Sequence, residues 1–169
     1  MLKKWLVFAN FVVIMIIGGY LAYLLSTVIP IPGSKFLIMG PFLTLVLMIP
    51  LERYPKLGTL SIINLVFGLV LFMITPWMTL AIVVSGLAAD LAMLFPTSHW
   101  IKRVVALGVY NTVSFGSTFY ITNFITGNHL YVVVGPFMIA GILVLTFLAG
   151  VLGALAGRWI HMKYLRKVK

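Results

Sequence analysis

The chain has no cysteine and only two acidic residues, Glu52 and Asp90, among its 169 residues. Without cysteine, disulfide bonds and thiolate metal sites are excluded. A catalytic site would need several acids, histidines or cysteines in one place, and the chain adds only three histidines to its two acids. The hydrolase motif G-x-S-x-G and the phosphate-binding motif G-x-x-x-x-G-K-[ST] do not occur either. We therefore expect no enzymatic activity, no metal site and no cofactor.

Apolar sequence is abundant instead: 63% of the residues are hydrophobic, 8% are charged, and the mean hydropathy is +1.19. Soluble domains are nearer half apolar and a quarter charged, so this composition indicates an integral membrane protein. The apolar runs reach or approach the roughly 20 residues that cross a bilayer as a helix, without the alternation of a barrel. We predict one all-α domain, residues 1–169, with six transmembrane helices at about 5–29, 36–51, 57–74, 77–95, 101–124 and 130–162.

Basic residues are distributed unequally between the two sets of connectors. Lysine and arginine in short loops favour the cytoplasmic side of a membrane. With six spans, one side holds only Lys35, and the other holds eleven basic residues: Lys3, Lys4, Arg53, Lys56, Lys102, Arg103, Arg158, Lys163, Arg166, Lys167 and Lys169. Both termini are therefore predicted to be cytoplasmic.

The stretch PIPGSKF, residues 30–36, carries Lys35, the only formal charge predicted on the outer side. The other outer connectors contribute Trp77, Asn123, His129 and Tyr131. A mixture of aromatic and polar side chains with one cation suits the mouth of a small-molecule site. Alternatively, Lys35 extends to the membrane surface beside interfacial aromatic residues. The residues alone leave both interpretations open.

A polar stripe lies in the outer half of the fifth predicted helix. Asn111, Ser114 and Thr118 follow the spacing i, i+3, i+7 and share one helix face. In lipid such a stripe points towards neighbouring helices or a cavity. It therefore either lines a pocket or supplies hydrogen bonds between helices.

Small residues recur four positions apart in two predicted helices. The first contains Gly18, Ala22 and Ser26, and the sixth contains Ala149, Gly153, Gly157 and, beside them, Gly150 and Ala154. This spacing lets helix backbones approach closely, within one protein or between two proteins. Packing within the chain is the simpler interpretation, and docking of another subunit is the alternative.

The two acids are expected to be paired. Glu52 precedes Arg53 and lies near Lys56, which predicts a local ion pair at headgroup level. Asp90 lies in the inner half of the fourth helix, where a carboxylate needs a cation or hydrogen-bond donors. The cations available on that side are Lys102, Arg103 and Arg158. A proton-coupled carrier built on Asp90 is a further alternative, but the internal repeat and broken helices often seen in such carriers are missing.

Three stretches resemble the substrate-binding S components of energy-coupling factor (ECF) transporters, which are six-helix membrane proteins with both termini inside. IPIPGSKFLIMGPFLTLVLMIPLERYPKLGTLSIINLVFGLV, residues 29–70, is similar to their loop-helix-loop-helix passage. VVSGLAADLAML, residues 83–94, resembles the end of their fourth helix. LAGVLGALAGRWIHMKYLRK, residues 148–167, resembles their glycine-rich sixth helix with its basic tail.

The resemblance implies a protein of a prokaryotic cell membrane that binds a vitamin or a related small organic micronutrient at its outer face. Delivery inward would require a transmembrane T subunit and two cytoplasmic ATPases. By position, the implied substrate contacts are Lys35, Trp77, Asn111, Ser114, Thr118, Asn123, His129 and Tyr131. The implied docking surface is on the first helix, where the small residues are Gly18, Ala22 and Ser26. The alternative function is a non-catalytic accessory or assembly subunit of a larger membrane complex.

Overall fold

The computed structural model describes residues 2–28, 34–127 and 135–165, with the side chains of residues 2–4 and 27 excepted, and the regular elements in these ranges are all helical. The α-helices are α1 Leu2–Thr27, α2 Ser34–Arg53, α3 Thr59–Phe72, α4 Pro76–Ala92, α5 His99–Tyr120 and α6 Pro136–Ile160. Two short π-helices, η1 Ile121–Ile125 and η3 His161–Leu165, continue α5 and α6. The all-α prediction is confirmed, and each predicted segment overlaps one observed α-helix.

Local sequence explains where the observed helices begin. Pro76 is the first residue of α4. An N–H group at this position would have no intrahelical acceptor, so its absence in proline costs no hydrogen bond. Gly58, predicted inside the third helix, adopts φ +85° instead, and α3 begins at the next residue. The sixth helix was predicted from residue 130, but α6 begins at Pro136, because proline suits the first turn of a helix. Residues 130–134 lie outside the described ranges.

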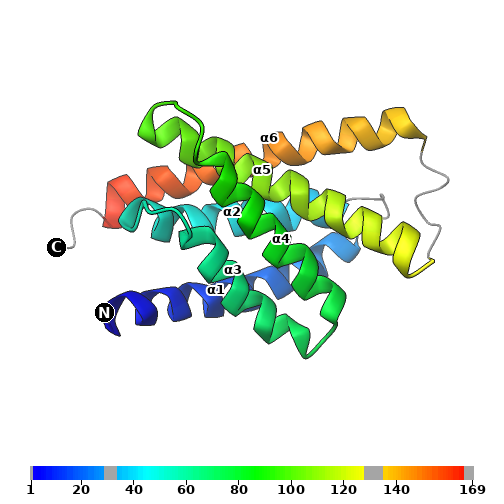
Figure 1. Cartoon of the computed structure of the whole chain (residues 1–169), viewed down its shortest axis with the longest axis horizontal. Coiled ribbons are helices and arrows are strands. Elements are labelled where there is room, and N and C mark those ends of the chain that lie inside the picture. Colours follow the sequence, from blue (N-terminus) through cyan, green and yellow to red (C-terminus); the bar gives the residue numbers. More distant parts are fainter. Residues whose placement is uncertain (1, 29–33, 128–134, 166–169) are drawn as a thin grey trace.

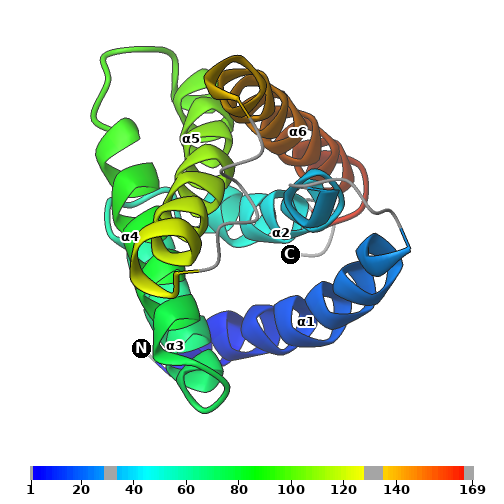
Figure 2. The same cartoon turned by 90° about the vertical axis from the view of Figure 1, so that its right-hand side faces the viewer.

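Helix α2 occupies the centre of the bundle. It packs against α1, α5 and α6, and the end-on view places it between α1 and the α5–α6 pair (Figure 2). Helix α4 packs between α3 and α5, which completes the bundle. The common core contains apolar side chains with no exposed surface from several helices: Met15, Leu47, Met48, Leu51, Leu60, Ile63 and Leu107.

The helices alternate in direction, so the bundle has two chemically different ends (Figure 1). We define the basic end by the start of α1, the end of α2, the start of α5 and the end of α6. The described basic residues other than Lys35 lie at or near this end: Lys3, Lys4, Arg53, Lys56, Lys102, Arg103, Arg158 and Lys163. Lys35, in the first turn of α2, lies at the opposite end. The structure thus groups these cations as predicted, while the cytoplasmic orientation of the basic end stays a prediction.

Four helical segments are long and apolar enough to cross a membrane: Trp5–Ser26, Ser34–Arg53, His99–Ile125 and Pro136–Leu165. This supports the prediction of a membrane protein. The other two α-helices are apolar but shorter, with 14 residues in α3 and 17 in α4. The described residues thus contain four helices of spanning length and a hairpin of two shorter ones, and six full spans stay a prediction.

Candidate functional site

Asn111, the first residue of the predicted polar stripe, lies inside the helix bundle. Its side chain is 2% exposed, and its Nδ2 donates a hydrogen bond to the carbonyl oxygen of Thr146 in α6 at 2.7 Å. A Cβ placed on Gly40 of α2 would come within 2.5 Å of Asn111 Cγ, and one on Gly150 within 2.9 Å of Asn111 Cβ. Asn111 therefore joins three helices, and its contacts favour interhelical packing over a pocket lining.

Beyond the stripe, at the end of α5, lies a buried oxygen atom that accepts no hydrogen bond from the described residues. Ser114 and Thr118 are half-buried. Asn123 follows in η1, where five π-helical residues replace the regular α-helix. Its Oδ1 atom is buried and accepts no hydrogen bond from the part of the chain that the structure describes. Buried polar atoms are nearly always paired, and π-helical turns are frequent at functional sites.

The first turn of α2 lies beside this part of α5. The rings of Phe36 and Phe115 meet edge to face with their centroids 5.4 Å apart. Lys35 is exposed, and its amine lies 4.6 Å from the centre of the Tyr23 ring and 3.4 Å from the Tyr23 hydroxyl oxygen. This contact with an aromatic residue of α1 favours the interfacial interpretation of Lys35. It also leaves the lysine accessible.

Other predicted site residues are more scattered. Trp77 is 43% exposed near the start of α4, at the same end of the bundle as Lys35 and Asn123. His129 and Tyr131 lie outside the described residues, as do the two prolines at positions 30 and 32. The structure therefore brings Lys35, Trp77 and Asn123 to one end of the bundle, on three different helices.

The small residues predicted for subunit docking face the interior of the protein. A Cβ on Gly18 would overlap the ring of Phe42 in α2. Ala22 is 8% exposed, and Ser26 is buried with its hydroxyl donating to the carbonyl oxygen of Tyr23 at 2.6 Å. These contacts agree with packing of α1 on α2 within the chain. The small residues of α6 behave in the same way, because Gly153 and Gly157 contact the backbone of α2.

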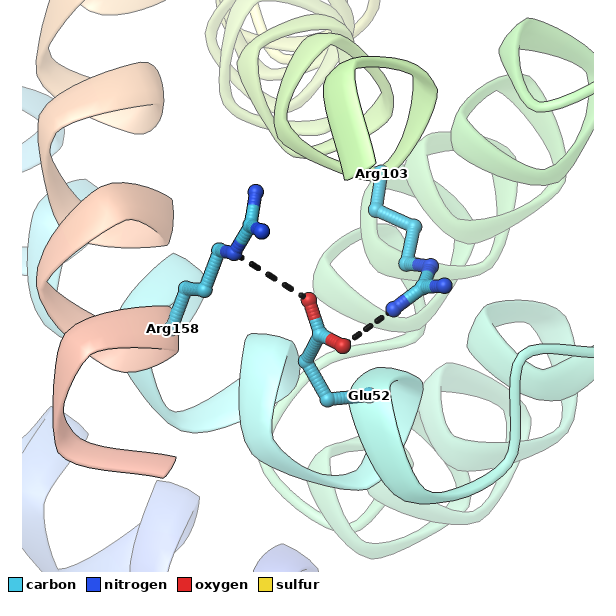
Figure 3. Close-up of polar contacts among 3 residues, drawn as sticks. All are labelled: Glu52, Arg103 and Arg158. Atoms are coloured by element: carbon cyan, nitrogen blue, oxygen red, sulfur yellow. Dashed lines mark hydrogen bonds and ion pairs between the residues drawn. The ribbon is translucent and has the colours of Figure 1, made fainter. Parts of the chain in front are cut away.

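Glu52 forms an ion-pair cluster that connects three helices at the basic end (Figure 3). Its Oε2 accepts a hydrogen bond from Nη1 of Arg103 in α5, and its Oε1 lies 3.9 Å from Nε of Arg158 in α6. The predicted partners Arg53 and Lys56 were wrong, because the ion pairs of Glu52 within the described residues are with Arg103 and Arg158. Adjacent residues of a helix point in different directions, whereas α5 and α6 bring their arginines directly to the end of α2.

Asp90 caps a helix instead of pairing with a cation. Its Oδ2 accepts hydrogen bonds from the backbone N–H of Ser61 at 2.7 Å and from the Ser61 hydroxyl at 2.5 Å. Ser61 lies in the first turn of α3, where backbone N–H groups lack intrahelical acceptors and negative charge is favourable. The N-cap residue, Gly58, has no side chain to supply this acceptor. Of the two predicted kinds of partner, hydrogen-bond donors are therefore confirmed, and pairing with Lys102, Arg103 or Arg158 is wrong.

Within the described ranges, no three histidine, aspartate or glutamate side chains lie close enough together to bind one metal ion. Comparisons of the chain with models of protein families, with curated proteins and with solved structures give no match.

Proposed function

We propose that the protein is a substrate-binding S component of an ECF-type importer in a prokaryotic cell membrane, with no enzymatic activity of its own. It would capture a vitamin or a related small organic molecule at the end of the bundle opposite the basic end. A transmembrane T subunit and two ATPases would then provide the energy for delivery inward. The orientation follows the positive-inside rule, which puts the basic end in the cytoplasm.

The buried Oδ1 of Asn123, which accepts no hydrogen bond from the described residues, is the observation that carries this proposal. A ligand N–H or O–H group bound there would satisfy an acceptor that is otherwise costly to bury. The same end of the bundle has the exposed Lys35 and the half-exposed Trp77, which add a cation and an aromatic surface. These groups suit a small polar organic molecule, neutral or anionic.

The first test is native mass spectrometry of the gently solubilised full-length protein, purified from its own host. A retained small molecule, together with a T subunit and ATPases, would support the proposal and give the mass of the substrate. Asn123→Ala and Lys35→Ala should then each weaken binding of that molecule by about tenfold, the typical effect of one lost hydrogen bond. Asn10→Ala and Lys56→Ala are matched controls, because both side chains are exposed and lie away from Asn123.

An accessory or assembly subunit is the second candidate, and the contacts of Asn111 favour it. The best hydrogen-bonding group of the stripe is used to join helices, as expected if the stripe stabilises packing. For this function, native mass spectrometry should show copurification with another membrane complex and no small ligand. Unchanged ligand affinity in both Asn123→Ala and Lys35→Ala would remove the structural basis of the S-component proposal.

A further inference from the structure

The basic end carries more positive charge than its acids neutralise, because Asp90 caps α3 and leaves Glu52 as the only acid that pairs with cations among the described residues. Glu52 alone serves two arginines, Arg103 and Arg158, whose side chains are 13% and 25% exposed. The Nε atom of Arg103 is buried and has no hydrogen-bond partner among the described residues. Lys102, beside Arg103, is half-buried and forms no ion pair within the described ranges. An anion is therefore expected near the start of α5 and the end of α6.

A groove lies between α5 and α6, further from the basic end than these cations. It has a volume of about 340 Å³ and is lined by apolar side chains and one threonine: Val109, Thr112, Val113, Leu143, Val144 and Phe147. Val144 is 60% exposed, so the groove opens to the surroundings of the bundle. In a membrane protein, hydrocarbon chains of lipids fill a surface groove of this composition.

The helical register connects the groove to the cations. Lys102 lies seven residues before Val109, and Arg158 lies fourteen residues after Val144, so each cation shares a helix face with a groove residue. At 1.5 Å per residue, the separations along the helices are roughly 10 and 21 Å. One leaflet of the hydrocarbon core is about 15 Å deep. The groove thus begins, at Val109, within the leaflet on the side of Lys102 and extends past the bilayer centre to Val144, so an extended lipid tail in it places its headgroup at the level of Lys102 and Arg158.

Two tryptophan rings contact cations near the start of α5 and the end of α6. The guanidinium of Arg158 lies 4.5 Å from the centre of the Trp100 ring, and Lys163 lies 4.6 Å from that of Trp159. Tryptophan is characteristic of the membrane interface, where its ring is partly in lipid and its N–H reaches polar groups. These contacts indicate that the start of α5 and the end of α6 lie at headgroup depth.

We propose that an anionic phospholipid binds specifically to the α5–α6 face, with one acyl chain in the groove and its phosphate beside Lys102 and Arg158. Charge complementarity selects the headgroup, because the excess cations attract an anion and, within the described residues, Arg103 pairs with no carboxylate other than Glu52. The apolar groove selects a lipid over a free phosphate or an acidic protein. The headgroup contacts are at the opposite end of the bundle from Asn123, the groove is in the middle of α5 and α6, and neither depends on the proposed transport function.

The test is native mass spectrometry of the full-length protein, titrated with phosphatidylglycerol or phosphatidylcholine of identical acyl chains. The wild-type protein should retain phosphatidylglycerol more strongly. Lys102→Gln with Arg158→Gln should weaken its binding about 30-fold, since each cation at a lipid surface contributes roughly a factor of five. Arg53→Gln with Lys56→Gln, two exposed cations of the same end, should have little effect. Equal losses in both pairs would show diffuse surface charge and overturn the site.

A second pair of variants tests whether an acyl chain occupies the groove. Val144→Trp fills it and should reduce phosphatidylglycerol binding, whereas Val84→Trp fills a separate groove between α4 and α5 and should not. Lys102→Gln alone removes no observed ion pair, so it tests the headgroup contact even if the double variant folds poorly. No preference for phosphatidylglycerol in the wild type would overturn the proposal. Phosphatidylglycerol binding that survives Val144→Trp would overturn the acyl-chain contact and leave only the headgroup contact with Lys102 and Arg158.

Discussion

Substitution of Gly153 by alanine should destabilise the protein, because the α2–α6 contact leaves no room for a methyl group. A Cβ at this position would lie 2.7 Å from Cα of Pro41 and still closer to the Pro41 carbonyl oxygen and the Thr44 hydroxyl. Carbon atoms normally pack at about 3.5–4.0 Å, so the helices would have to separate by roughly 1 Å. Thr44 cannot easily move aside, since its hydroxyl donates to the carbonyl oxygens of Gly40 and Pro41 at 3.0 and 3.1 Å.

The expected magnitude follows from two opposing terms. Overpacking a core costs about 1–3 kcal/mol, and the upper value applies here because the obstacle is mostly backbone. Replacing a helical glycine by alanine returns about 0.5–1 kcal/mol. Gly153→Ala should therefore lose about 2 kcal/mol of unfolding free energy. For a chain of this size that loss lowers the melting temperature by about 4–8 °C.

Thermal unfolding of the purified protein in detergent, followed by circular dichroism, measures this difference. Gly141 provides a matched control in the same helix, because a Cβ there would meet no atom within 4 Å. Gly141→Ala should leave the melting temperature unchanged or raise it slightly. If Gly153→Ala melts at or above Gly141→Ala, the close contact between α2 and α6 is wrong.

Two further predictions concern the acids. Glu52→Gln should lose about 3 kcal/mol in the same unfolding assay, because Arg103 would keep a buried and unpaired charge; the exposed Arg53→Gln is the control, and equal melting temperatures would contradict the cluster. Asp90→Ala should lose about 1–3 kcal/mol by leaving the first-turn N–H of Ser61 unsatisfied. Asp90→Asn should restore part of that stability, since an amide oxygen can still accept the hydrogen bond; no difference between the two variants would argue against the capping role.

The sequence predicts the helices well because their signals are local. Apolar runs of membrane length are readable from neighbouring residues, although the exact starts are not, since Gly58 was predicted inside the third helix and in fact precedes α3. The grouping of the described cations at one end is predictable for the same reason, since it depends only on alternation of helix direction. The register of one helix against another is different, because it depends on which side chains interlock across the interface.

The partners of the polar residues show this limit. Asn111 is correctly predicted to face inward, but only the positions of Gly40, Gly150 and Thr146 show that its amide is used in packing. Likewise, sequence proximity suggested Arg53 for Glu52, whereas the contact with Arg103 spans 51 positions of the chain. The location of Arg103 and Arg158 at the basic end of the bundle was predictable. Pairing across helices was not.

The short helices α3 and α4 have a consequence for the bilayer around the protein. At 1.5 Å per residue, α3 is about 21 Å long and α4 about 26 Å, against a hydrocarbon thickness of about 30 Å. Beside this hairpin, lipid must thin, or headgroups and water must enter the gap, and each ångström of mismatch costs a fraction of a kcal/mol. Beside α1 and α6 no such deformation is needed. A hairpin of this length that crossed the membrane would therefore deform it on one flank only, and that asymmetry would favour thin bilayers and give neighbouring proteins a preferred side of approach.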